Sequence, residues 1–167
     1  MDNNNLVATP GVGDDSAMNW TELHLALNHV PVIGVPFLMA LLVWGLFRRS
    51  GEIVRLAHGW LILLSVVSIA IKFTGDFAAD QSKDRLAPSQ AQVERHEQSA
   101  DQATTGLFLL GLVAALALFA GRRKPLPPRW AGVLVLIVGF ATCILLTRTA
   151  RAGGQIGHPE LRSAPVR

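Results

Sequence analysis

Histidine is the residue type in this sequence that is best suited to bind a cofactor, and the chain has five of them. A neutral imidazole nitrogen is a common ligand of transition metals and of haem iron. Four of the five fall in segments that we expect on one side of a membrane, and these four are the candidate metal ligands: His24, His29, His96 and His158. His58 is expected on the other side, where a polar interface residue is the simpler interpretation.

The spacing of these histidines limits how they could share a metal. His24 and His29 flank the start of the first apolar run. Residues five apart on a helix differ by roughly 140° in direction and about 7.5 Å in height, so these two would not bind one iron together. Each could pair with His96 or His158, which favours one or two haem b groups near the outer surface. Copper or zinc, or interface histidines without any cofactor, are the alternatives.

Charged residues beside these segments have two possible roles. Arg148 and Arg151 follow the last apolar run and could neutralise the propionates of a bound haem. The alternative is that they are simple interfacial cations. Lys72 and Asp76 are four residues apart, so they share a helix face and could form a local ion pair.

Four apolar segments must position these side chains. Each approaches the roughly 20 residues that a helix needs to cross the hydrocarbon core, and none alternates as a barrel strand does. They cover residues 30–47, 53–73, 105–120 and 130–147. We therefore expect an all-α integral membrane four-helix bundle, up-down-up-down, with a helical extension before the third span on the outer side. The expected domains are a disordered acidic segment (1–19), the bundle (20–151) and an outer C-terminal tail (152–167).

The distribution of charge predicts the orientation. Short loops rich in lysine and arginine stay in the cytoplasm. The connection between the first two spans, together with Arg55 at the start of the second, has three arginines and one glutamate. The connection between the last two has four basic residues and no acid. The N-terminal segment and the 76–103 loop are acidic by comparison. We therefore expect both termini and the long loop outside a bacterial-type inner membrane.

Composition and motifs exclude several other classes of protein. Hydrophobic residues make up 50% of the chain and charged residues 16%, too few charges for a soluble domain of this size. No basic run interleaved with aromatics indicates nucleic-acid binding. The single cysteine, Cys143, rules out an intrachain disulfide. Hydrolase motifs are missing, and the few polar residues in the spans argue against a transporter.

The opening of the first span, from His24 to Pro31, resembles an uncharacterised family of small bacterial four-helix inner-membrane proteins. Their first helix opens with a pattern like His-Pro-x-x-Val-His-Phe-Pro, and further motifs follow the second helix, precede the third and end the bundle. The counterparts here are Thr74-Gly75, His96 and Gly153-Gly154 followed by His158. The resemblance extends from about Leu23 to Glu160. It implies a four-helix membrane bundle and, because haem b binding is suspected for such proteins, a haem site.

Two functions are consistent with these observations. The first is a membrane electron-transfer protein resembling a b-type cytochrome, which would exchange electrons with quinol or with a periplasmic redox protein. The second is an accessory or scaffold subunit that binds other membrane subunits and carries no cofactor. In both cases the chain's main surroundings are the lipid bilayer. Whether the protein is an enzyme is left open by the sequence.

Overall fold

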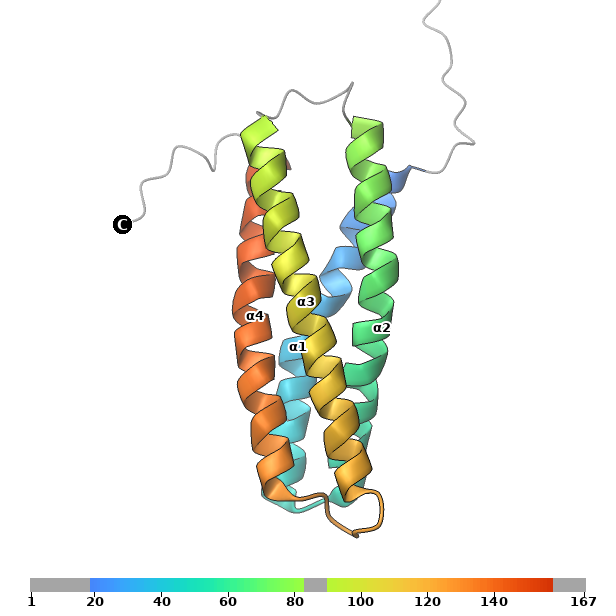
Figure 1. The fold of residues 1–167 in the computed structure, drawn as a ribbon, viewed down its shortest axis with the longest axis vertical. Helices are drawn as coiled ribbons and strands as arrows, with labels where there is room; N and C mark the ends of the chain where they lie inside the picture. The colour runs from blue at the N-terminus through green and yellow to red at the C-terminus, as the bar shows by residue number, and fades with distance from the viewer. Residues whose placement is uncertain (1–18, 83–89, 158–167) are drawn as a thin grey trace, which may run out of the picture.

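The computed structural model describes residues 19–82 and 90–157, and these residues form four α-helices and no β-strand. The helices are α1 (Trp20–Arg48), α2 (Gly51–Ser82), α3 (Gln90–Gly121) and α4 (Arg129–Gly157). Figure 1 shows them side by side in one elongated bundle, with α1 and α3 running in one direction and α2 and α4 in the other. The expected all-α class with four helices is confirmed.

The connection between α1 and α2 shows how the sequence sets the bundle's turns. α1 ends at Arg49, which adopts the left-handed conformation (φ 53°) and donates its amide hydrogen to the carbonyls of Gly45 and Leu46. The Ser50 hydroxyl then accepts a hydrogen bond from the Ile53 amide at 3.4 Å, which caps the first turn of α2. Because only two residues separate them, α1 and α2 must be antiparallel neighbours.

Each helix packs mainly against two others, so the order around the bundle is α1, α2, α3, α4. One side chain from each helix is at most 1% exposed, and these form a continuous apolar centre: Leu42, Leu61, Leu110 and Val135. Helices α2 and α3 come especially close where Gly111 faces the side chain of Ser65. A larger residue at position 111 would collide there, so the glycine permits the close approach.

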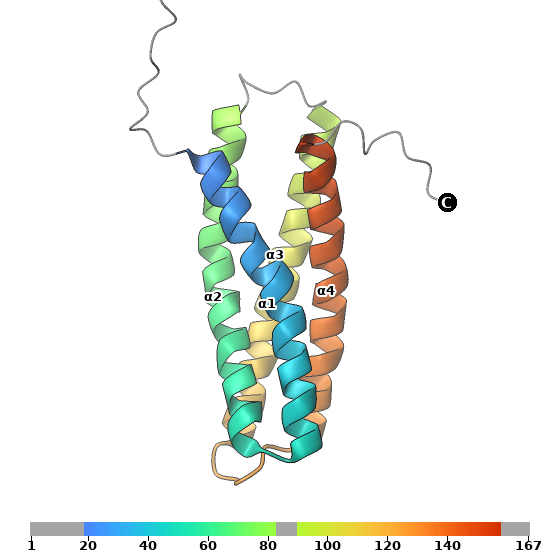
Figure 2. The same cartoon turned by 180° about the vertical axis from the view of Figure 1, so that it is seen from behind.

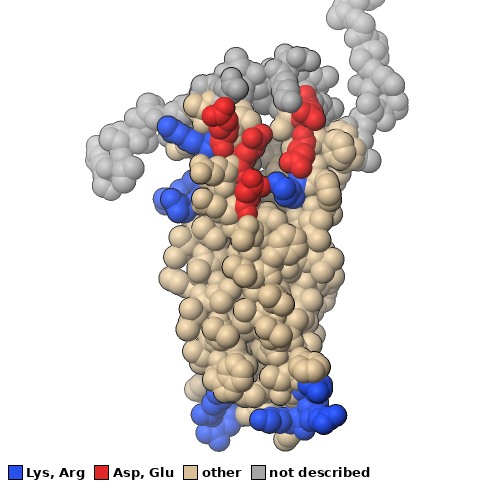
Figure 3. All heavy atoms as spheres, viewed as in Figure 1, with Lys and Arg blue, Asp and Glu red and all other residues tan. Residues whose placement is uncertain are grey.

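The outer surface of the bundle is apolar as well. Large exposed hydrophobic side chains come from every helix, among them Phe37 (66%), Phe73 (59%), Phe119 (62%) and Phe140 (67%). Figure 3 shows charged side chains gathered at the two ends, with a wide uncharged belt between them. A soluble bundle would carry polar residues on its outer faces. All four helices are long and apolar enough to cross a membrane, as in a multi-pass membrane protein.

The height of the uncharged belt matches a bilayer. At one end the basic loops follow α1 and α3. At the other, the Lys72 ammonium forms an ion pair with Asp101 at 2.5 Å, between α2 and α3. The helix rises about 32 Å from Gly51 to Lys72, and about 30 Å from Asp101 to Gly121. Both values agree with a hydrocarbon core about 30 Å thick.

The helices are longer than the apolar runs indicate. α1 begins at Trp20, so Pro31 lies inside the helix and not in its first turn, and the helix also continues through Pro36. Each proline removes one backbone hydrogen bond, and Figure 2 shows the first part of α1 leaning toward α2.

α4 continues past Arg151 to Gly157, so residues 152–157 are helical and not part of a tail. α3 begins at Gln90, so the segment before the expected third span is helical, in agreement with the expected extension. The segment expected to be disordered lies outside the described residues, except for its last residue, Asn19.

Candidate functional site

The structure places two of the four expected histidine ligands at the same end of the bundle. His24 on α1 and His96 on α3 lie near the acidic end of the bundle, close enough to interact electrostatically. Helices α1 and α3 are diagonal in the bundle, so the two imidazoles approach from opposite sides. His158 lies outside the described residues.

The hydrogen bonds around His24 determine which ring nitrogen is free. The Thr74 hydroxyl donates its only hydrogen to the Ile71 carbonyl at 2.7 Å. Toward the ring, the Thr74 oxygen can therefore only accept, and it lies 3.2 Å from His24 Nδ1. With His24 Nδ1 as the donor to Thr74, the tautomer assigned from these hydrogen bonds has its proton on Nδ1 and an unshared lone pair on Nε2. This is the arrangement of a metal-ligating histidine whose other nitrogen is held by an acceptor.

His96 has a similar environment, with one nitrogen left without a partner. The imidazole interacts with the backbone of Thr149 on α4. Its Nδ1 is buried and makes no hydrogen bond in the part of the chain that the structure describes. Buried polar atoms nearly always have a hydrogen-bond partner, so a buried nitrogen without one requires an explanation.

A glycine on the next helix faces each imidazole. A Cβ built on Gly75 of α2 would lie 2.9 Å from His24 Cε1, and one on Gly153 of α4 would lie 3.0 Å from His96 Cε1. Around the bundle this layer therefore alternates histidine, glycine, histidine, glycine. Any larger side chain at either glycine would displace the ring that it faces. The two glycines thus allow each imidazole to pack directly against the neighbouring helix.

This layer lies just beyond the apolar belt. Gly75 comes three residues after Lys72, and His96 comes five residues before Asp101, which places the layer roughly 4.5–7.5 Å beyond the ion pair. The sequence favoured Asp76 as the partner of Lys72, but the hydrogen-bonded partner is Asp101, across the α2–α3 interface. Asp76 contributes only a longer-range electrostatic interaction. The pair therefore joins two helices instead of stabilising one.

The other expected ligands lie away from this layer. His29 is exposed, and its Nδ1 is 2.5 Å from the Leu25 carbonyl one turn earlier on α1. The roughly 140° between positions 24 and 29 explains this, because only one of the two can face inward. Arg148 and Arg151 are both exposed on α4. Any contact that they make with a cofactor's propionates would be at the surface of the bundle.

His58 is located differently from what the sequence indicates. It is 0% exposed, and neither of its ring nitrogens has a hydrogen-bond partner among the described residues. It belongs to the end of the bundle with the basic loops, far from the half-buried His24 and His96. Ala57, Ala114, Ala117 and Ala131 are core residues at this end of the bundle. An interface position, as expected from the sequence, would leave the ring in contact with water or headgroups.

The available ligands narrow the kind of centre that this layer could hold. Among residues 19–82 and 90–157, no group of three or more histidine, cysteine, aspartate or glutamate side chains could hold a metal ion. Protein zinc sites use three or four such ligands. Two imidazoles are sufficient for haem, because the porphyrin supplies the remaining four nitrogens. Comparison with protein-family models, curated proteins and solved structures gave no match.

Proposed function

We propose that this chain is a bacterial inner-membrane protein that crosses the bilayer four times in up-down-up-down order, with both termini outside. The charges support this orientation. Figure 3 shows basic side chains at one end of the belt, and acidic side chains occur together with basic ones at the other. Arg122, Arg123 and Lys124 follow α3 directly, with no acidic residue in that connection. Short basic connections of this kind stay in the cytoplasm.

We further propose that His24 and His96 would hold a haem b at the outer end of the bundle by binding its iron. Three observations support this. The Nε2 lone pair of His24 is free because Thr74 holds Nδ1. His96 has a buried nitrogen with no partner. Gly75 and Gly153 keep side chains out of the layer that both rings share. The unpartnered nitrogen of His96 is the strongest support, because binding to the iron would remove the free-energy cost of burying this nitrogen without a hydrogen bond.

Haem supplies reversible one-electron chemistry when it is bound. The work of the protein is to hold the two imidazoles neutral and correctly oriented. Thr74 does this for His24, and the Thr149 backbone does it for His96. The layer lies beyond the hydrocarbon core on the outer side, so the centre could exchange electrons with quinol from the bilayer or with a periplasmic redox protein. The proposed function is membrane-bound electron transfer resembling that of a b-type cytochrome.

The test is the absorbance spectrum and haem content of protein purified from haem-replete cells. We expect a reduced haem b spectrum that is lost in His24→Ala and in His96→Ala. His29→Ala is the matched control, because His29 belongs to the same helix as His24 but is exposed. The control should retain the spectrum. Colourless protein, or equal loss in all three variants, would contradict the haem proposal and favour an accessory subunit without a cofactor.

A further inference from the structure

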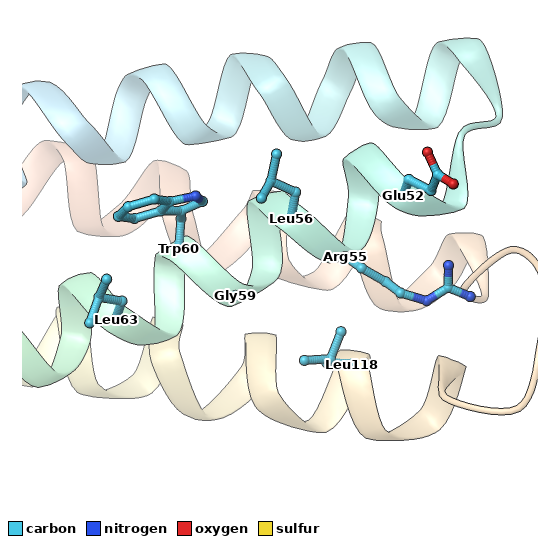
Figure 4. A pocket seen from close by; sticks show the side chains of 7 residues that line it. All are labelled: Glu52, Arg55, Leu56, Gly59, Trp60, Leu63 and Leu118. Carbon is cyan, nitrogen blue, oxygen red and sulfur yellow. The ribbon is translucent and has the colours of Figure 1, made fainter.

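A surface groove lies between α2 and α3 at the basic end of the bundle, far from the histidine layer. Its volume is about 500 Å³, within the range of small-ligand sites. The residues that line it are shown in Figure 4: Glu52, Arg55, Leu56, Gly59, Trp60, Leu63 and Leu118. Apart from the two charged residues at one end, the lining is apolar. The groove is therefore apolar along nearly all of its length, with two residues of opposite charge, Glu52 and Arg55, at one end.

Gly59 creates the hollow in the middle of this lining. A Cβ at Gly59 would have no atom within 4 Å, so nothing in the protein fills that space. Around it, Leu56 is 53% exposed, Trp60 50% and Leu63 46%. These side chains belong to the uncharged belt and face outward from the bundle. An apolar chain lying over Gly59 would cover them.

Arg55 is held at the charged end of the groove. Its guanidinium nitrogen Nη2 donates to the backbone carbonyls of Lys124 at 2.6 Å and Pro125 at 3.2 Å. Figure 4 shows the side chain extending toward the end of the bundle. A guanidinium has five N–H donors, so others remain for an anion. Arg55 bonds no carboxylate of the described residues.

We propose that this groove binds one anionic phospholipid of the cytoplasmic leaflet, with the phosphate at Arg55 and an acyl chain along Gly59 toward Leu63. From residue 55 to residue 63 the helix rises about 12 Å, along which the chain would lie. Charge complementarity supports an anionic occupant, because Glu52 is outnumbered at this end by seven basic residues: Arg48, Arg49, Arg55, Arg122, Arg123, Lys124 and Arg129. Figure 3 shows basic side chains gathered there. Basic pockets between membrane helices on the cytoplasmic side are known to bind such headgroups. The inference rests on the membrane placement proposed above and not on the haem.

The test measures quenching of Trp60 fluorescence by lipids with brominated acyl chains. The full-length protein keeps Trp60 and has phenylalanine in place of the other three tryptophans. It is placed in bilayers of brominated phosphatidylglycerol or brominated phosphatidylcholine, each diluted in the same unbrominated lipid. We expect about fivefold stronger apparent binding of the anionic lipid, the preference that one basic residue near the membrane surface provides. Added inorganic phosphate should not compete, because it lacks the acyl chain.

Two variants locate the effect, and one serves as a control. Arg55→Gln should abolish the preference, whereas Arg123→Gln at the same end should retain it. Gly59→Leu places a side chain where a Cβ would meet no atom within 4 Å, and it should weaken quenching by both lipids. Quenching without a lipid preference, or no effect of both Arg55→Gln and Gly59→Leu, would overturn the groove proposal alone. No quenching by either lipid would overturn the membrane placement as well.

Discussion

Two adjacent glycines on α4 provide a matched test of the histidine layer. A Cβ at Gly153 would lie 3.0 Å from His96 Cε1, whereas one at Gly154 would have no atom within 4 Å. Alanine at either position should gain about 0.5–1 kcal/mol, because glycine is unfavourable in a helix. At Gly153 this gain is opposed by overpacking. An ordinary contact begins at 3.4 Å, so the imidazole must withdraw by about 0.4 Å.

The difference between the two variants can be estimated from these terms. Overpacking of this kind costs about 1–3 kcal/mol, so Gly153→Ala should be less stable than Gly154→Ala by that amount. For a chain of this length, the difference corresponds to roughly 2–12 °C in Tm. Haem affinity should fall by about 10–100-fold in Gly153→Ala only, the usual effect of disturbing a ligand's surroundings.

Both quantities are measurable on purified protein in detergent. Thermal unfolding followed by circular dichroism gives Tm, and the haem-to-protein ratio after titration gives the affinity. If Gly153→Ala matched Gly154→Ala in both, the close contact between α4 and His96 would not exist as described. Equal haem binding with a lower Tm would leave the packing correct and would contradict the role of His96 as a ligand.

Three further predictions address the rest of the bundle. His58→Leu should keep or raise Tm, because it replaces a buried ring whose nitrogens are unpartnered, and a loss of several degrees would contradict that description. Double-mutant cycles should give a coupling free energy of about 0.2–1 kcal/mol between Lys72 and Asp101, and a smaller one between Lys72 and Asp76. A larger coupling with Asp76 would show that the ion pair is local to α2. A cysteine at position 124, in a variant without the native cysteine, should react with a membrane-impermeant thiol reagent only after the inner membrane is opened. Labelling in intact cells would mean that this connection faces outward, the opposite of the proposed topology.

Much of the fold follows from the sequence because hydrophobic runs of membrane length have few alternatives. The four helices were predictable, but their ends were not. Hydropathy detects only the part inside the hydrocarbon core, whereas the helices continue into polar sequence as far as a capping residue allows. Asn19 provides such a cap, since its side chain accepts from the Glu22 amide. The same limitation applies at residues 152–157, which hydropathy leaves outside the last span although α4 continues to Gly157.

The candidate site was less predictable because facing direction depends on packing between helices. Sequence spacing showed that His24 and His29 point in different directions, but could not show which one faces inward. The roles of Thr74, Gly75 and Gly153 beside the two rings also require the contacts between helices. The resemblance drew attention to these residues without assigning them partners. His58 gave no sign of its burial, because a single histidine in an apolar run fits an interface position equally well.

The most direct test of the central claim is the spin state of the oxidised iron in the purified protein. Two axial imidazoles give low-spin ferric haem, which electron paramagnetic resonance distinguishes from the high-spin form with a single histidine. We predict a low-spin signal in the wild-type protein, conversion to high spin or loss of haem when either His24 or His96 is replaced by alanine, and no change for His29→Ala. A protein without haem, or a low-spin signal that survives both single replacements, would contradict the account.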